Sequence, residues 1–123
     1  MKKNILIVGG SSGIGLTLVK QIHSKNNLFV ANRSNEGLND LPVTYIPYDV
    51  EADELEISKL PETLDGLVYC PGTINLRPFK GLKPEVFFKD FSINVMGAVK
   101  TLQSVLSRLN NCETCASVVF FST

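Results

Sequence analysis

The chain has 123 residues, 44% of them hydrophobic and 20% charged, a composition typical of one globular domain with a buried core. Twelve basic side chains balance twelve acidic ones and are scattered along the chain, which argues against nucleic acid or an anionic membrane as a partner. That charge balance favours a small or neutral partner. The apolar run after the basic start is too short for a secretory signal or a membrane span, so we expect a cytoplasmic protein.

Short apolar runs alternate with amphipathic stretches along the chain. In chain order they predict a strand at residues 5–8, a helix at 14–23, strands at 28–32 and 43–46, a short acidic helix or turn at 52–59, a strand at 66–70, a long helix at 84–109 and a strand at 117–121. The long helix carries one apolar stripe, which consists of Val95, Ala98, Val99, Leu102, Leu106 and Leu109. Strands separated by helices need crossover connections, so we expect an α/β fold, a doubly wound parallel sheet of about five strands.

A glycine-rich corner, GGSSGIG at residues 9–15, joins the first strand to the first helix. Glycine lets a ligand touch the main chain, and the start of a helix offers free N–H groups to a phosphate. A P-loop is excluded because Leu16 stands where lysine is required, and G-x-G-x-x-G is excluded because Leu18 stands at its third small position. We therefore expect a cradle for a diphosphate, made of Gly9, Ser11, Ser12, Gly13, Ile14 and Gly15.

The segment VGGSSGIG resembles the short-chain dehydrogenase/reductase family, whose usual form is T-G-x-x-x-G-I-G; Val8 stands at the threonine position. The resemblance implies an NAD(P)-binding Rossmann domain over residues 1–123, similar to the amino-terminal portion of the family and truncated after the fifth strand. A strand as apolar as residues 117–121 would then form an exposed sheet edge.

The family selects its cofactor at the end of the second strand, where the chain reads Asn32-Arg33-Ser34 and has no carboxylate. Arg33 is suited to a 2′-phosphate, so the resemblance implies NADP, with NAD as second choice. The alternative is that Arg33 is a solvated turn residue.

Two more strand ends resemble the family. Asp49-Val50 is similar to the pair that contacts the adenine, although an Asp at a strand end is often only a helix cap. Tyr69-Cys70-Pro71-Gly72 stands where the family usually has Asn-Asn-Ala-Gly. Cys70, Pro71 and Gly72 would border the cofactor, and the replaced asparagines leave the support of the central strand to other groups.

The resemblance also assigns catalytic roles. Residues 92–97 are similar to the family's Asn-Val-x-Gly segment, which makes Asn94 the asparagine that holds a relay water. Ser122 follows the last strand, 28 residues after Asn94 (122 − 94), a separation like that in the family, which makes it the serine that polarises the substrate. Asn94 is alternatively a solvated surface residue, and Ser122 a polar residue that ends a strand. The family's Tyr-x-x-x-Lys acid occurs nowhere in the sequence, so we expect the chain alone to be inactive.

The resulting prediction is the cofactor-binding part of an NADP-dependent oxidoreductase that interconverts a carbonyl and an alcohol. The alternative is a non-catalytic nucleotide sensor or an inactive homologue. Cys112 and Cys115 form a C-x-x-C without a second pair of ligands, so we expect no metal site. By resemblance, the intact protein is expected to be a homodimer or homotetramer.

Overall fold

Five parallel strands form one sheet in the computed structural model, which describes residues 2–121. The strands are β1 (Lys3–Val8), β2 (Asn26–Asn32), β3 (Thr44–Pro47), β4 (Gly66–Tyr69) and β5 (Ser117–Phe120). Their order is β3-β2-β1-β4-β5, so β1 is the central strand, with Leu6 opposite Phe29 of β2 and Leu67 of β4. The predicted parallel sheet of about five strands is confirmed.

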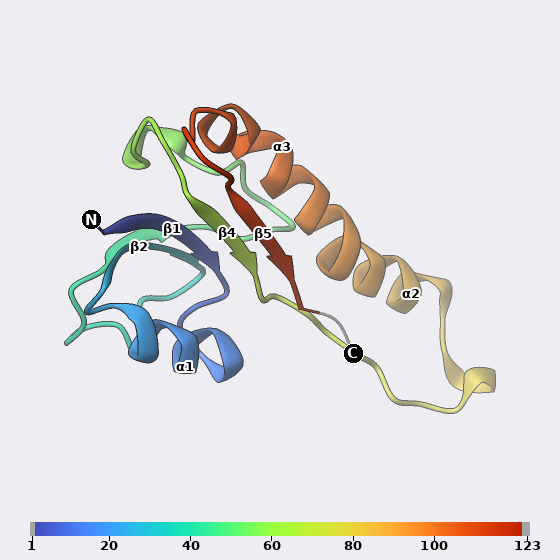
Figure 1. Ribbon diagram of the computed structural model, residues 1–123. Helices are drawn as coiled ribbons and strands as arrows, with labels where there is room; N and C mark the ends of the chain where they lie inside the picture. The colour runs from blue at the N-terminus through green and yellow to red at the C-terminus, as the bar shows by residue number, and fades with distance from the viewer. Residues whose placement is uncertain (1, 122–123) are drawn as a thin grey trace.

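Helices cover both faces of the sheet (Figure 1). Helix α1 (Gly13–Ile22) lies on one face, and the other carries a continuous helical rod made of α2 (Pro84–Phe91), a π-helical turn η3 (Ser92–Met96) and α3 (Gly97–Asn110). Two short 3₁₀ turns, η1 (Ile57–Lys59) and η2 (Phe79–Gly81), lie in the connections. This arrangement confirms the doubly wound α/β prediction.

The hydrophobic core is divided by the sheet into two layers. Ile7 and Val30 pack with Val19 beneath α1. Leu6 and Leu67 face the other way and pack with Val105 of α3. Alternate residues of the central strand therefore point into opposite layers, and β1 is covered on both faces as expected of a parallel sheet between helices.

Residues 52–59 form a turn rather than an α-helix. The backbone N–H groups of Ala52 and Asp53 donate to the carbonyl of Asp49, and regular structure resumes only at the 3₁₀ turn η1. The segment predicted as a short acidic helix or turn thus contains a turn and the 3₁₀ turn η1, but no α-helix. The closely spaced carboxylates of this segment would repel one another on a helix. Leu55 is buried in the core, and this contact holds the segment in its non-helical conformation.

The apolar stripe predicted for the long helix does not form one buried face in the structure. The buried face of α3 consists of Gly97, Ala98, Thr101, Val105 and Leu109, whereas Val95, Val99 and Leu106 are 40–48% exposed. Thr101 is the reason, because it is polar yet completely buried: its hydroxyl donates to the carbonyl of Gly97 and bonds the hydroxyl of Tyr48. The predicted stripe combined buried and exposed positions of the helix, because the residue at the centre of the buried face, Thr101, is polar and was not counted.

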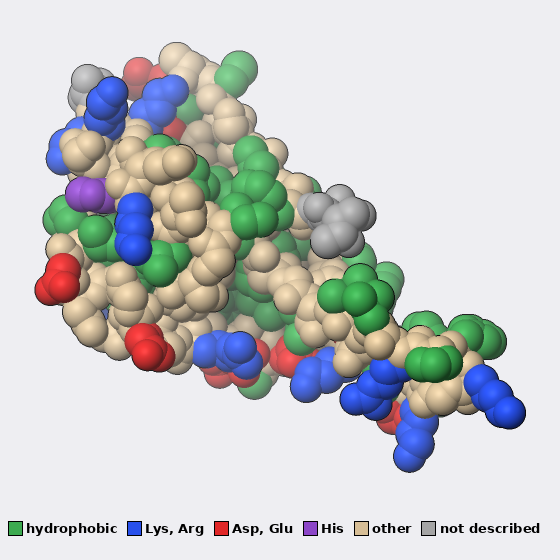
Figure 2. All heavy atoms as spheres, turned by 90° about the horizontal axis from the view of Figure 1, so that it is seen from below, with side chains coloured by type: hydrophobic (Ala, Val, Ile, Leu, Met, Phe, Trp, Pro, Cys, Tyr) green, Lys and Arg blue, Asp and Glu red, His purple; other side chains and the backbone are tan. Residues whose placement is uncertain are grey.

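Strand β5 lies at the edge of the sheet and is exposed along its length, as predicted. At the protruding end of the molecule, over η2 and the start of α2, basic and apolar side chains gather together (Figure 2). They include Arg77, Lys80, Lys83, Leu76, Phe79 and Phe88. Among residues 2–121, no helix combines the length and the apolar character needed to cross a bilayer.

Candidate dinucleotide site

The glycine-rich corner is built by direct contact between main-chain atoms. Gly9 and Gly13 have φ angles of 82° and 54°, in the left-handed region that other residues rarely adopt. A Cβ atom on Gly15 would meet the carbonyl oxygen of Gly9, so only glycine lets the first turn of α1 approach the end of β1. The corner is therefore a shallow surface of main-chain amides rather than of side chains.

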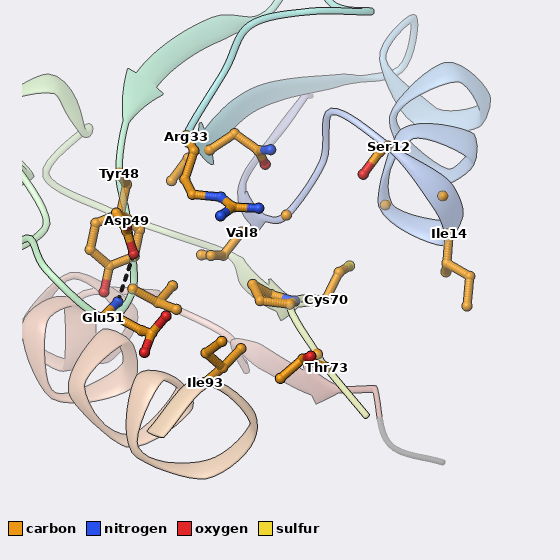
Figure 3. Close-up of a pocket in the computed structure, with 18 of the residues that line it drawn as sticks. Val8, Ser12, Ile14, Arg33, Tyr48, Asp49, Glu51, Cys70, Thr73 and Ile93 are labelled. Atoms are coloured by element: carbon orange, nitrogen blue, oxygen red, sulfur yellow. Dashed lines mark hydrogen bonds between the residues drawn. The ribbon is translucent and has the colours of Figure 1, made fainter. Parts of the chain in front are cut away.

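The start of α1 leaves polar groups free for a ligand. Ser12 is the N-cap residue, but among the described residues its side chain makes no capping hydrogen bond to the helix. Figure 3 shows the Ser12 hydroxyl directed toward the space beside the corner. The unpaired N–H groups of the first helical turn and this hydroxyl together favour an anion.

A cavity of about 510 Å³ opens at the carboxyl ends of β1 to β4. This volume lies in the range of about 300–1,000 Å³ that ligand pockets occupy. Of the predicted cofactor residues, those that line the cavity are Gly9, Ser12, Gly13, Ile14, Gly15, Asn32, Arg33, Asp49, Val50, Cys70, Pro71 and Gly72. The topology thus brings residues from four segments of the sequence to one site, as expected for ligand binding in open α/β sheets.

Two predicted residues, Ser11 and Ser34, do not line the cavity. The Ser11 hydroxyl accepts a hydrogen bond from the side-chain amide of Asn32, and it thereby ties the glycine-rich corner to the end of β2. The Ser34 hydroxyl accepts one from the backbone N–H of Glu36, 3.1 Å away, within a local turn. Both serines organise the main chain around the site.

The end of β2 presents one cation to the cavity. Arg33 is exposed, and its guanidinium lies over the cavity between the glycine corner and the segment that follows β3 (Figure 3). The side-chain oxygen of Asn32 is buried without a hydrogen-bond partner among the described residues. A buried acceptor without a partner is costly, so the end of β2 carries an unsatisfied polar atom beside the cavity.

Asp49 is partly occupied by its own loop. One of its carboxylate oxygens accepts a hydrogen bond from the backbone N–H of Glu51 at 2.9 Å, the bond drawn in Figure 3. Its backbone N–H donates to the carboxylate of Asp53, also at 2.9 Å. These two bonds fix the loop after β3 at the cavity wall. Asp49 therefore braces a turn; no helix begins directly after it in the described chain, so the helix-cap alternative predicted for Asp49 is wrong.

The segment after β4 is held by Asn94 of the π-helical turn. The Asn94 side-chain oxygen accepts from the backbone N–H of Thr73, and its amide donates to the Thr73 carbonyl, both at 2.8 Å. Asn94 is exposed, and it adjoins the cavity through Thr73, which is a lining residue. Burial raises the pKa of the neighbouring Cys70 thiol to about 11, so this side of the cavity is lined by a neutral group.

Comparison with known proteins decides the family. The family model described as short chain dehydrogenase matches residues 3–123, almost the whole chain. The chain belongs to the short-chain dehydrogenase family. Members of this family are oxidoreductases that generally bind NAD or NADP.

Solved structures of short-chain dehydrogenases have the same fold. A short-chain dehydrogenase from Streptomyces avermitilis superposes with a TM-score of 0.88 at 21% identity, and covers 100% of this chain and 50% of its own. A family protein from Francisella tularensis gives 0.83 at 19% identity, covering 100% and 52%. The aldohexose dehydrogenase of Thermoplasma acidophilum gives 0.85 at 16% identity, covering 99% and 49%. The chain therefore spans about half the length of these dehydrogenases.

A curated relative is more similar in sequence. It is the PIGF/3-ketodihydrosphingosine reductase fusion protein of Schizosaccharomyces pombe, 28% identical over 125 residues, which cover 88% of this chain and 25% of the relative.

Sequence patterns did not indicate seven further residues that line the cavity of this family member: Val8, Ala31, Tyr48, Glu51, Thr73, Lys89 and Ile93. Lys89 and Ile93 are four residues apart in the helical rod, so the helical period that indicated its apolar stripe also places them on one face. Ser122, the predicted substrate-polarising serine, lies outside the described residues.

Proposed function

We propose that this chain is the cofactor-binding part of an NADP-dependent short-chain oxidoreductase that interconverts a carbonyl and an alcohol. The observation that carries the proposal is the glycine-rich corner, whose main-chain amides open into a cavity where four parallel strands end. The reductase in the name of the S. pombe relative supports a carbonyl as the substrate class.

The residues of the cavity fit a nicotinamide dinucleotide. A side chain at Gly15 would push the first turn of α1 away from the end of β1 and disrupt the cradle. The free Ser12 hydroxyl with the first N–H groups of α1 would hold the diphosphate. Asp49 and Val50 would contact the adenine, while Cys70, Pro71 and Gly72 would border the nicotinamide ribose. When bound, the cofactor supplies or accepts the hydride; the chain binds and orients it.

The end of β2 favours NADP over NAD. A carboxylate that would accept the ribose hydroxyls of NAD is missing from Asn32-Arg33-Ser34, and Arg33 offers a planar donor fork suited to a 2′-phosphate. Asn94 and Ser122 remain the proposed catalytic residues, and we propose a cytoplasmic homodimer or homotetramer for the intact protein.

Replacement of Arg33 tests the cofactor preference. Arg33→Ala is expected to weaken NADPH binding about tenfold or more, the range of a lost charge-assisted contact, and to change NADH binding less than twofold. Fluorescence titration of both nucleotides measures the two dissociation constants. Lys20→Ala removes an exposed cation in the last turn of α1, and serves as the charge-matched control. Equal loss of both nucleotides, or of neither, in Arg33→Ala contradicts the NADP assignment.

A further inference from the structure

Tyr69, the last residue of β4, occupies a position where the family usually has asparagine, and its side chain reaches across to the helical rod. The side chain is 1% exposed, and its ring packs edge-on against Phe120 of β5, with 6.4 Å between the ring centroids. The hydroxyl donates a hydrogen bond to the backbone carbonyl of Ile93 at 2.6 Å. A strand residue therefore contacts the main chain of the π-helical turn directly.

The π-helical turn explains why the Ile93 carbonyl can take this bond. In an α-helix, the N–H of Gly97 would donate to the carbonyl four residues earlier, at Ile93. Here the N–H of Gly97 donates to the carbonyl of Ser92 instead, five residues earlier. The Tyr69 hydroxyl stands in for the Gly97 N–H at the Ile93 carbonyl.

Gly97 provides the space for this hydroxyl. A Cβ atom on Gly97 would meet the Tyr69 hydroxyl, and would lie 3.1 Å from the Cβ of Val50, which lines the cavity. Tyr69 and Gly97 thus depend on each other: a side chain at position 97 would displace the hydroxyl from the Ile93 carbonyl.

The turn that Tyr69 holds forms part of the cavity wall. Ile93 lines the cavity, and the next residue, Asn94, makes two hydrogen bonds with Thr73, which also lines it. Figure 3 shows Ile93 and Thr73 on the same side of the cavity. A shift of the π-helical turn would therefore move Ile93 of the helical rod and Thr73 of the loop after β4, which both line this wall.

We propose that Tyr69 is a positioning residue of the dinucleotide cavity: its hydroxyl, seated at Gly97, holds the Ile93 carbonyl and thereby keeps Ile93 and Asn94 at the cavity wall. The part of this inference that concerns the cofactor rests on the proposed function. Burial is the main cause that raises the pKa of Tyr69, followed by the nearby Tyr48 hydroxyl, so Tyr69 stays protonated and able to donate at neutral pH.

The first test follows the side-chain amide of Asn94 by two-dimensional NMR. In Tyr69→Phe the phenyl ring remains and only the hydroxyl is lost, and we expect the Asn94 amide resonances to move and their exchange with water to quicken. Thr101→Val is the control, because it removes a fully buried hydroxyl that belongs to the helical rod itself, from a residue that does not line the cavity. We expect both variants to lose about 4 °C or more in Tm, but only Tyr69→Phe to change the Asn94 signals.

The second test measures NADPH binding by the same proteins. Tyr69→Phe is expected to weaken binding about fivefold, and Thr101→Val less than twofold. Gly97→Ala keeps the tyrosine but obstructs its hydroxyl, so it should reproduce the Tyr69→Phe effect on Asn94. Because both changes break the same contact, the double variant should lose less affinity than the two single losses combined.

The outcomes separate the inference from the proposed function. If Tyr69→Phe and Gly97→Ala leave the Asn94 signals and NADPH affinity as in Thr101→Val, Tyr69 is only a structural residue and the inference is wrong. If the unmodified chain binds neither nucleotide, the proposed function is wrong, while the Asn94 signals still decide whether Tyr69 positions the turn.

Discussion

Gly15 packs against the carbonyl of Gly9, so the end of β1 and the first turn of α1 touch through main-chain atoms alone. In Gly15→Ala the added methyl group must push the two segments apart, at a cost of about 1–3 kcal/mol in the free energy of unfolding, and the cradle opens. We expect lower thermal stability and loss of NADPH binding, measured by calorimetry and fluorescence titration.

Gly81→Ala is a control variant for which we expect no loss of stability. A Cβ atom there would meet nothing within 4 Å among the described residues, and the backbone is not in the left-handed region. Gly81→Ala should leave stability unchanged or raise it by about 0.4–1 kcal/mol, by restricting the unfolded chain. Equal stability of the two alanine variants would contradict the packing at Gly15.

Cys70 lines the cavity with a thiol whose pKa burial raises to about 11. The thiolate is the reactive form, so at pH 8 only about one Cys70 in a thousand is ionised, and its reactivity should rise about tenfold per pH unit up to the pKa. Iodoacetamide labelling followed by mass spectrometry should therefore find the exposed Cys115 modified first at pH 8. Modification of Cys70 as fast as Cys115 at that pH would show that the thiol is not buried.

Residue patterns predicted much of the site, and their limits are physical. The glycine spacing at residues 9–15 indicated the cradle because a positive φ or a close main-chain contact requires glycine there, and these positions lie within one short stretch of sequence. The contact of Tyr69 with Ile93 has no such local signal, because it joins residues 24 positions apart through a single hydroxyl. Ser11 stays a predicted cofactor residue, and its hydrogen bond from Asn32 has no signal in the glycine-rich run, because it joins residues 21 positions apart.

At the scale of elements, Asn94 links the π-helical turn to the loop after β4 by two hydrogen bonds to Thr73. Asn94→Ala removes both, so we expect backbone amides in residues 71–80 to exchange with deuterium about tenfold faster, with little change in the sheet. Asn75→Ala removes one bond, to Asp90, and should have a smaller effect. Unchanged exchange in this loop after loss of Asn94 would contradict its role as a clamp.

Helices and strands were predictable where buried apolar residues recur at regular spacing along the chain. They were not predictable where a single polar contact sets the local structure. The inner strands β1 and β4 showed as unbroken apolar runs because both of their faces are covered. The π-helical turn was not predicted, since it adds one residue to a helix whose composition is ordinary on either side. The buried face of α3 was misassigned because it includes a polar residue, Thr101. Its hydroxyl can be buried because it donates a hydrogen bond to the carbonyl of Gly97 in the same helix.

At the scale of the whole molecule, β5 leaves an apolar sheet edge uncovered in the described chain. Val118, Val119, Phe120 and Phe121 are 40–50% exposed. Exposed edges of this kind pair with other chains, and a lysine on the edge opposes such pairing. We expect concentration-dependent self-association of the chain, which Val119→Lys reduces while Tm changes little, as measured by sedimentation velocity.

A lysine placed elsewhere separates edge pairing from a general effect of charge. Gln21→Lys adds the same charge on the exposed surface of α1 and should associate as the unmodified chain does. Association that is equal in all three proteins would show that the edge of β5 is not responsible.

The central claim is that main-chain amides of the glycine-rich corner bind the diphosphate of a nicotinamide dinucleotide. Titration of the isotopically labelled chain with NADP⁺, followed by amide NMR, tests it most directly. The account predicts that the largest shifts fall on the amides of Gly9, Ser12, Gly13 and Gly15, with further shifts at Arg33 and Asp49. Saturating NADP⁺ and NAD⁺ that leave these amides unmoved in the folded chain, or that move only signals outside the cavity, would contradict it.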